Sequence, residues 1–273
     1  MPEREFDKLK PHPFRDVIEG RAGTRTPHAD DGNGHHADHD DSHAAAYAEL
    51  CVTTNYTFLT GSSHPEEFIT HAAQLGYHAV AVTDLHTVAG VVRAHVAAKD
   101  SGMQFVLGSR IRPRDLPRCS VCLYPVDMDA YRRLCRLLTT GKRRTVKGEC
   151  ELFFADLEQH HAGLLAILLP DDDATHDDVD AAAARLQPLF DDDRLSLALR
   201  LGYSADDHGR ADSAAAVSAR RGIPLVATND AHYHDADRRM LHDVLACIRE
   251  GCTLAEAGYR LAECAALADA GEH

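Results

Sequence analysis

The sequence predicts an α/β fold, a single barrel of alternating strands and helices that follows a disordered N-terminal arm. From Tyr47 onward, short apolar runs rich in β-branched residues alternate with longer amphipathic segments. Strict alternation of this kind favours a parallel sheet, because each helix returns the chain to the start of the next strand. Seven strand–helix units, within 273 residues of which 44% are hydrophobic, favour a closed or nearly closed barrel over an open sheet.

The arm comprises residues 1–46, and residues 47–273 form the barrel with its C-terminal helices. Between residues 20 and 46, glycines are interspersed with a tract of His and Asp. A segment of this composition cannot bury enough apolar surface to offset the entropy lost on ordering. We therefore expect a solvated arm, with loose metal chelation by its histidines as the alternative.

The barrel elements follow one another without long interruptions. The strands are expected near residues 48–53, 78–83, 104–108, 120–124, 163–169, 194–201 and 224–228. The helices are expected over residues 65–75, 88–100, 127–138, 178–190, 206–221, 235–249 and 254–268. A capping box of Ser63 and Glu66 starts the first helix, and Gly76, Gly102 and Gly222 provide the left-handed residues that end helices.

Charge and composition narrow the class of protein. The net charge of −14 opposes tight, nonspecific binding of nucleic acid. No apolar run reaches the ~18 residues that a membrane span needs, and residues 1–10 do not form an apolar signal segment. We therefore expect a cytoplasmic protein without membrane contact, whose eight cysteines are reduced thiols.

Chemistry-bearing side chains stand where two predicted strands end. Asp84 follows the strand at residues 78–83, and Asp230 and His232 follow the strand at residues 224–228. The carboxyl ends of strands form the rim where α/β proteins place their chemistry. Alternate residues of an extended segment point to the same side, so Asp230 and His232 form a pair that suits a divalent metal.

A family resemblance rests on motifs spread over nearly the whole predicted barrel. These motifs are Tyr47–Leu50, Asn55–Glu67, Ala81–Asp84, Ala89–His95, Val106–Ser109, Tyr131–Leu137, Lys147–Gly148, Pro224–His234 and Asp243–Arg249. In order and register they resemble the PHP (polymerase and histidinol phosphatase) domain of error-prone bacterial DNA polymerase III alpha subunits. The resemblance spans about Tyr47 to Leu261 and implies a distorted seven-unit (β/α) barrel. It also implies a rim site of several Zn, Mn or Fe ions that hydrolyses phosphoesters with metal-activated water.

This chain departs from the family's metal motifs at most positions. Asp84, Asp230 and His232 match the expected ligands. Other residues replace the remaining ones: Cys51, Thr53, Leu85, Arg110 and Arg200. We expect Arg110 to pair with Asp84 or Asp230 in a buried ion pair. The alternative is one weakly held Zn or Mn ion on Asp84, Asp230 and His232, with His86 or Cys51 as an extra ligand.

The resemblance leaves two functions open. In the family, a polymerase core follows this domain, and the printed sequence has no length for it, so we expect no DNA synthesis from this chain alone. The first hypothesis is an accessory or interaction module of DNA replication or repair, with polymerases or translesion-repair proteins as partners. The alternative is a metal-dependent phosphoesterase with a reduced metal site. A truncated gene product without a distinct role fits the sequence equally well.

A basic stretch introduces one further hypothesis, contact with nucleic acid. It follows the predicted strand at residues 120–124 and contains Arg132, Arg133, Arg136, Lys142, Arg143, Arg144 and Lys147. Such a stretch can line a phosphate backbone or can simply be a solvated helix face. Because the net charge opposes the first interpretation, we expect weak or no nucleic-acid binding.

Overall fold

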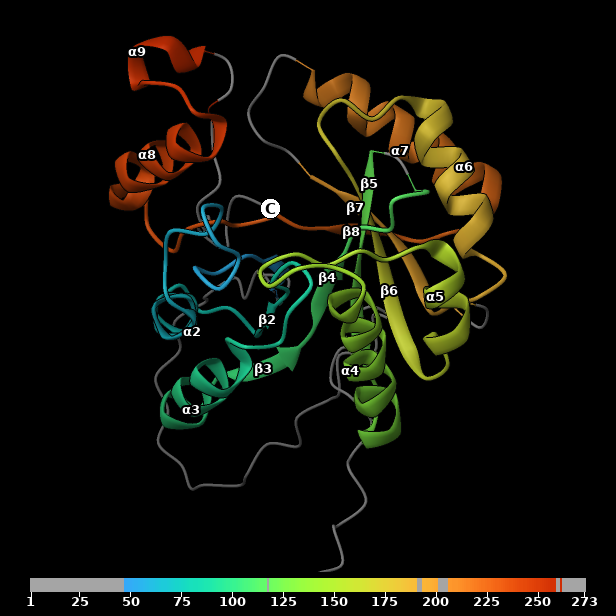
Figure 1. The fold of residues 1–273 in the computed structure, drawn as a ribbon, viewed down its shortest axis with the longest axis horizontal. Helices are drawn as coiled ribbons and strands as arrows, with labels where there is room; N and C mark the ends of the chain where they lie inside the picture. Colours follow the sequence, from blue (N-terminus) through green and yellow to red (C-terminus); the bar gives the residue numbers. More distant parts are fainter. Residues whose placement is uncertain (1–46, 117, 191–192, 201–205, 259–260, 262–273) are drawn as a thin grey trace, which may run out of the picture.

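The computed structural model describes residues 47–258, except 117, 191–192 and 201–205, together with residue 261. Strands and helices alternate along this part of the chain, and helices cover the outer faces of two sheets (Figure 1). The predicted arm, residues 1–46, lies outside the described residues. So does most of the predicted helix at 254–268, of which the structure describes the turn α9 (Leu254–Ala257).

A parallel three-stranded sheet forms one side of the molecule. Its order is β1 (Ala48–Val52), β2 (Ala79–Val82) and β3 (Gln104–Leu107). Helices α2 (Pro65–Gln74) and α3 (Val91–Ser101) bury Phe68, Ile69 and Ala94 in a core with Val80 and Val82 of β2. Helix α2 begins one residue later than the predicted capping box, since Glu67 and not Glu66 accepts the backbone N–H of His64.

A mixed five-stranded sheet forms the other side. Its order is β4 (Ser109–Ile111), β5 (Cys119–Pro125), β6 (Leu164–Pro170), β7 (Leu195–Leu199) and β8 (Leu225–Ala227). Its helices are α4 (Met128–Arg143), α5 (Phe154–His160), α6 (His176–Leu186) and α7 (Asp207–Arg221). Helix α4 packs on β5, α6 on β5 and β6, and α7 on β7 and β8. The chain continues through the 3₁₀ turn η1 (Ala236–Arg238) into α8 (Arg239–Glu250).

The prediction of a wholly parallel sheet is wrong for β5, which pairs antiparallel with both β4 and β6. Residues 112–118 connect β4 to β5, and a parallel connection needs a crossover of a dozen or more residues. The predicted strand at 104–108 also continues past Gly108 into the unpredicted strand β4. A Cβ on Gly108 would lie 2.8 Å from the Tyr124 ring and 2.9 Å from Thr83. Glycine therefore lets the chain cross from the first sheet to the second at this position without a steric clash.

The predicted seven-unit barrel is not confirmed, because the described strands pair as two sheets. Isolated bridges join the sheet edges, Val52 to Ala231 on one side and Leu85 to Arg110 on the other. Apolar side chains from both sheets pack together between them. This interior core includes Leu50, Ala81, Val106, Tyr124, Ile167 and Ala198. Within the described part of the chain, no helix is both long and apolar enough to cross a membrane.

The buried carboxylate of Glu49 holds β1 to the end of β8. Its Oε1 accepts the Thr228 hydroxyl and the Cys51 backbone N–H (2.9 Å), and its Oε2 accepts the Tyr47 hydroxyl and the Asn229 backbone N–H, both at 2.9 Å. Burial raises the pKa of Glu49, although each of these hydrogen bonds opposes that shift. Four donors therefore depend on one side chain at the edge where the first and last strands meet.

We expect Glu49→Gln to lower the free energy of unfolding by about 2–4 kcal/mol, because a neutral amide turns its NH₂ group toward buried donors. Urea denaturation at pH 7 measures the change. The matched control is Glu158→Gln, an exposed residue of α5 whose substitution should stay within about 0.5 kcal/mol of the parent protein. Equal small effects of the two substitutions would contradict the role assigned to Glu49.

Candidate functional site

Asp230 lies at the centre of a buried ion-pair cluster. Its Oδ1 accepts a hydrogen bond from Arg110 of β4, and its Oδ2 accepts one from Arg200, just after β7, at 3.0 Å. Asp230 itself follows β8 with a φ of 50°, a left-handed backbone conformation in which Asp is better tolerated than most residues. The predicted ion pair between Arg110 and Asp230 is therefore confirmed, and a second guanidinium shares the same carboxylate.

The electrostatics of the cluster keep Asp230 ionised and His232 neutral. Burial opposes ionisation of Asp230, but the cations of Arg110 and Arg200 hold its pKa well below the usual range. Burial lowers the pKa of His232 to about 4, against the opposing effect of Asp230. His232 Nε2 lies 3.8 Å from Asp230 Oδ1 and has no hydrogen-bond partner among the described residues.

Asp84 has a separate structural role in the loop that follows β1. Its Oδ1 accepts the Thr54 backbone N–H and the Thr57 hydroxyl, both at 2.8 Å, and its Oδ2 accepts the Thr54 hydroxyl at 2.7 Å. Burial raises the pKa of Asp84, and these hydrogen bonds offset part of the shift. The carboxylate thereby holds the loop between β1 and α2 instead of facing an open site.

The two predicted extra ligands lie in different surroundings. Cys51 is buried in the interior core, with its Sγ 3.8 Å from the Sγ of Cys122. The hydrogen bond to Cys122 and burial raise the pKa of the Cys51 thiol. His86, at a φ of 57°, accepts the Arg112 backbone N–H at its Nε2 (3.0 Å), and burial lowers its pKa to about 4.

The side chains present do not fit a polynuclear metal site. Among the described residues, His, Cys, Asp and Glu form no group of three or more that could hold a metal ion, and the five predicted ligands all belong to that part. Both oxygens of Asp230 already accept guanidinium hydrogen bonds, and those of Asp84 accept a backbone amide and two hydroxyls. Each carboxylate would have to break these bonds before it could bind a metal.

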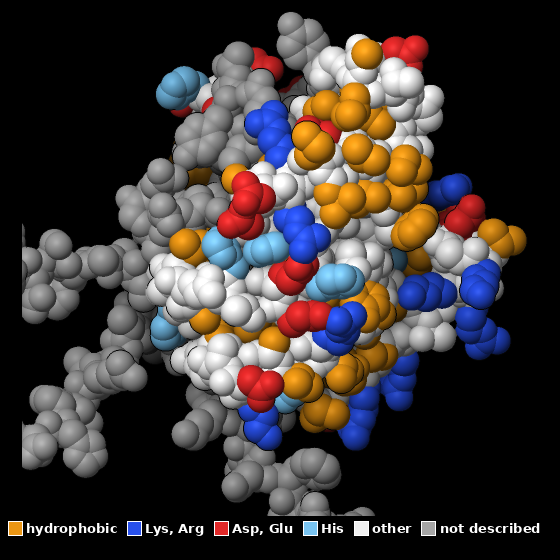
Figure 2. Space-filling model, turned by 90° about the vertical axis from the view of Figure 1, so that its left-hand side faces the viewer, with side chains coloured by type: hydrophobic (Ala, Val, Ile, Leu, Met, Phe, Trp, Pro, Cys, Tyr) orange, Lys and Arg blue, Asp and Glu red, His pale blue; other side chains and the backbone are white. Residues whose placement is uncertain are grey.

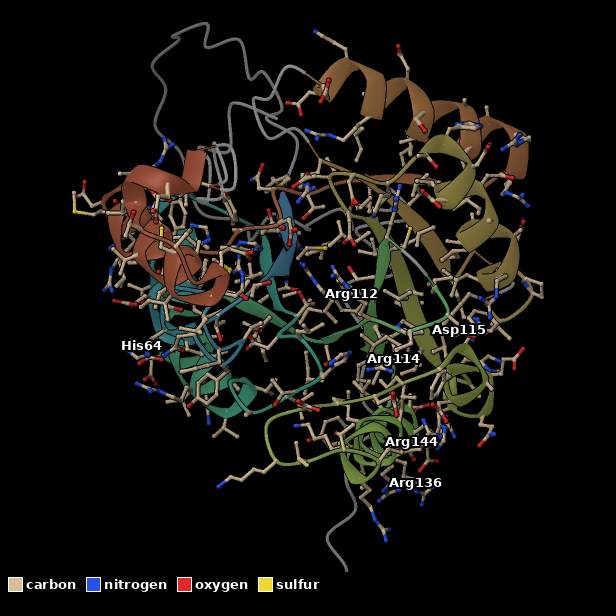
Figure 3. All side chains as sticks on the ribbon, turned by 45° about the horizontal axis from the view of Figure 1, so that its top comes forward. His64, Arg112, Arg114, Asp115, Arg136 and Arg144 are labelled. Carbon is tan, nitrogen blue, oxygen red and sulfur yellow. The ribbon has the colours of Figure 1, made fainter. Side chains whose placement is uncertain are left out.

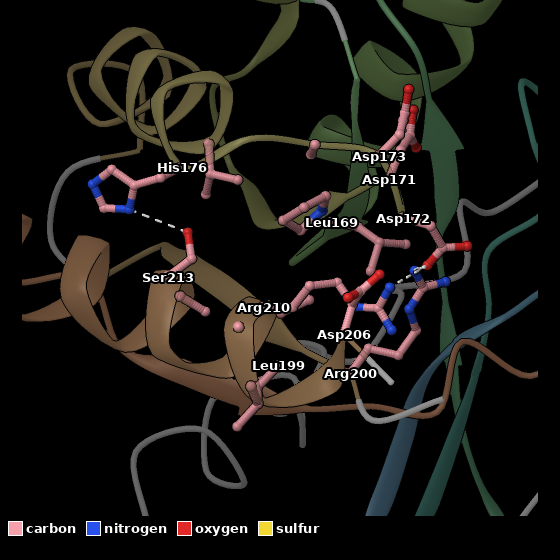
Figure 4. Close-up of a pocket in the computed structure, with 16 residues that line it drawn as sticks. Leu169, Asp171, Asp172, Asp173, His176, Leu199, Arg200, Asp206, Arg210 and Ser213 are labelled. Carbon is pink, nitrogen blue, oxygen red and sulfur yellow. Dashed lines mark hydrogen bonds and ion pairs between the residues drawn. The ribbon is translucent and has the colours of Figure 1, made fainter. Parts of the chain in front are cut away.

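A cavity of about 440 Å³ opens beside the cluster (Figure 4). It lies between the ends of β6 and β7 and helices α6 and α7, and Arg200 lines it. On this side, Arg200 also pairs with the exposed Asp172, to which Arg210 lies 3.6 Å away. His176 Nδ1 and Ser213 Oγ form a hydrogen bond of 3.1 Å on the opposite wall. The cavity therefore gives the buried ion pair a solvent-facing side.

The basic residues predicted to contact nucleic acid divide into two sets. Arg144 forms a two-point ion pair with Asp156 and lies 5.5 Å from the centroid of the Phe153 ring, and Arg133 donates to Ala162 O at 2.6 Å. The other set, exposed residues on or next to α4, is Arg132, Arg136, Lys142, Arg143 and Lys147. Arg136 and Arg144 lie beside α4 in Figure 3. Weak or absent nucleic-acid binding stays a prediction.

Fold and cluster together define an α/β protein whose strand-end residues meet at one rim and form an ion-pair site there. The sequence profile of the PHP domain matches residues 49–199, which is more than half of the chain. The chain belongs to the PHP domain family, so the resemblance read from its motifs is confirmed.

Similar proteins match a longer part of the chain than the domain profile does. Error-prone DNA polymerase 1 of Agrobacterium fabrum is 41% identical over 217 residues, covering 80% of this chain and 19% of the polymerase. The error-prone DNA polymerase of Methylococcus capsulatus is 42% identical over 218 residues, covering 80% and 20%. The chain thus spans about a fifth of the length of the curated relatives it matches.

One solved structure shares the fold at low sequence identity. It is a protein of Bifidobacterium adolescentis described as a metal-dependent phosphoesterase, with a TM-score of 0.50 and 14% identity. The match covers 69% of this chain and 88% of that protein. At this identity the likeness concerns the fold alone.

Sequence reasoning missed the role of Glu49 and the contact of Asp172 with Arg200. Glu49 was visible as the one charged residue of an otherwise apolar strand, a position that a carboxylate occupies only when donors surround it. Asp172 was visible as part of an acidic run after the predicted strand at residues 163–169. Its contact with Arg200 depends on how two loops meet and has no local signal.

We expect Asp230→Asn to lower the free energy of unfolding by about 3 kcal/mol at pH 7, because two guanidinium groups lose their shared buried counter-ion. The pKa of Asp230 is depressed in the folded state, so its contribution is present above the unfolded value of about 3.9 and is lost as the pH falls below it. Urea titrations at pH 7, 5 and 3.5 should show a constant difference between the two proteins at the higher pH values and a smaller one at pH 3.5.

The control is Asp212→Asn, an exposed position of α7. It should change the free energy of unfolding by less than about 0.5 kcal/mol at each pH. A difference between parent and Asp230→Asn that grows toward pH 3.5 would contradict the assignment of the ion pair.

Proposed function

We propose that this chain is a degenerate PHP module that acts as an accessory or interaction protein of error-prone DNA polymerases in replication or repair. The observation that carries the proposal is the commitment of Asp230 to Arg110 and Arg200 at the rim. A guanidinium group needs no metal to balance the carboxylate, so the cluster stabilises the fold without hydrolytic chemistry.

The relatives support the polymerase part of the proposal. These relatives are named error-prone DNA polymerases, and the region that matches this chain makes up about a fifth of each polymerase. This chain is about 40% identical to that region, while positions where the family resemblance implies metal ligands carry Arg110, Arg200 and Cys51. The module would act in the cytoplasm.

The fold supports the same interpretation. The two sheets would act as one distorted seven-unit barrel, in which β3 and β4 together supply one strand. Three observations support this closure: the bridges at both sheet edges, the shared interior core and the Glu49 bonds from β1 to the end of β8.

A second candidate function is a metal-dependent phosphoesterase with a reduced site. The observation that favours it is the buried His232 Nε2, which lacks a hydrogen-bond partner among the described residues and lies near Asp230. Asp230 and His232 would hold a Zn or Mn ion, which would supply metal-activated water. Asp84 would join them only after releasing the Thr54–Thr57 loop.

We expect protein purified without chelators to contain less than about a tenth of an equivalent of Zn or Mn, because guanidinium groups already balance the Asp230 charge. Elemental analysis measures the metal, and hydrolysis of p-nitrophenyl phosphate with added Zn or Mn measures the activity. An active metal-dependent phosphoesterase serves as the positive control. Near-stoichiometric metal that disappears in both Asp230→Asn and His232→Ala would overturn the proposal and favour the second function.

A further inference from the structure

Two cysteines from different sheets meet in the interior core. Cys51 lies on β1 of the three-stranded sheet, and Cys122 lies on β5 of the five-stranded sheet. The Cys51 thiol donates a hydrogen bond to Cys122 Sγ over 3.8 Å, and both side chains are fully buried. The two residues are 71 positions apart in the chain, so the fold, and not the local sequence, brings the thiols together.

The neighbours of this pair leave the two thiols facing each other. The Tyr124 hydroxyl lies 3.9 Å from Cys51 Sγ and donates to Leu50 O at 2.5 Å. Cys119, three residues before Cys122 on β5, belongs to the other core, because residues an odd number of positions apart on a strand face opposite sides. Cys122 therefore points across the interior core toward Cys51.

The charges around the pair favour a thiolate on Cys122. A thiolate is the reactive form of cysteine, and a nearby cation or hydrogen-bond donor stabilises it. The hydrogen bond from Cys51 lowers the pKa of Cys122, and so does the cation of Arg110, while burial opposes the shift. Cys51 keeps its proton, because the same hydrogen bond and burial raise its pKa.

The position of the pair restricts it to small reagents. Side chains of α2, α3 and α8 cover the first sheet on the side of the molecule that Figure 2 shows. Arg110, whose charge acts on both thiols, also belongs to the rim cluster, where its side chain is 11% exposed. The pair thus lies beneath the rim, at a depth that suits hydrogen peroxide, a molecule little larger than water.

We propose that Cys51 and Cys122 form a modification site at which a peroxide creates a disulfide between the two sheets. With hydrogen peroxide, the Cys122 thiolate attacks one oxygen, the O–O bond breaks, and a sulfenic acid and one water form after proton transfer. The Cys51 thiol then attacks the sulfenic sulfur, the S–S bond forms, the S–O bond breaks, and a second water leaves. The two thiols together lose two electrons, and one peroxide is reduced to two waters.

The disulfide changes how the two sheets are held together. In the reduced protein, two isolated bridges at the sheet edges and the packing of the interior core connect them. A bond from Cys51 to Cys122 adds a covalent link from β1 to β5 through the middle of this core. Since the link joins residues 71 positions apart, it restricts the unfolded chain and makes the oxidised protein harder to unfold.

The test uses the full chain, reduced with dithiothreitol, freed of the reductant and treated with excess hydrogen peroxide. Remaining thiols are alkylated in denaturant, and the digested protein is mapped by mass spectrometry without reduction. The test variant is Cys122→Ala. The matched control is Cys119→Ala, which removes an equally buried thiol from the same strand on the side of the other core. Circular dichroism compares the fold of both variants with that of the parent.

We expect a peptide that is cross-linked between Cys51 and Cys122 in the parent and in Cys119→Ala, and none in Cys122→Ala. Oxidation should raise the midpoint of urea unfolding of the parent by roughly 1 M, because the cross-link restricts the unfolded chain. Dithiothreitol should reverse this rise, and Cys122→Ala should not show it. The map of Cys119→Ala decides the question even if Cys122→Ala does not fold, because Cys122 is then the cysteine that remains on β5.

The half-buried Cys135 and Cys150 report whether the peroxide has acted. If these thiols are oxidised while Cys51 and Cys122 are recovered in alkylated form, the proposal is wrong. A disulfide from Cys51 or Cys122 to a different cysteine, or to a second copy of the chain, also overturns it. So does a cross-linked parent whose urea midpoint equals that of the reduced protein, since the disulfide would then not hold the sheets together.

Discussion

The carboxylate of Asp230, shared between two guanidinium groups, is the interaction on which the rim of this protein depends. It brings together β4, the end of β7 and the segment after β8 in a buried site. Breaking a buried ion pair by removing one partner is costly, because the other charges stay desolvated. The rim is therefore a stabilising element of the fold, and both oxygens of Asp230 are engaged in these bonds.

Three buried carboxylates hold separate parts of the fold together. Glu49 holds β1 to the end of β8, Asp84 holds the loop between β1 and α2, and Asp230 holds Arg110. Each satisfies donors that would otherwise be buried without partners.

Much of the element order could be predicted from the sequence, because periodic apolar runs and terminating residues are local signals. Every predicted strand and helix before residue 250 has a counterpart in the structure. The strand β4 and helix α5 were missed, since Ser109–Ile111 and Phe154–His160 are too short to show a period. The antiparallel direction of β5 was also missed. Without β4, the connection that precedes β5 looks longer than it is, and a long connection is compatible with a parallel pair.

The sequence by itself determined which residues reach the rim: Asp84, Asp230 and His232 end strands, and Arg110 and Arg200 replace expected metal ligands. It also determined the family, because motif order and spacing persist along the chain. Only the tertiary structure decided the partners, turning Asp84 toward Thr54 and Thr57 and placing Asp230 between two arginines. The reason is physical: a strand end sets where a side chain starts, whereas its hydrogen bonds depend on loops more than twenty residues away in the chain.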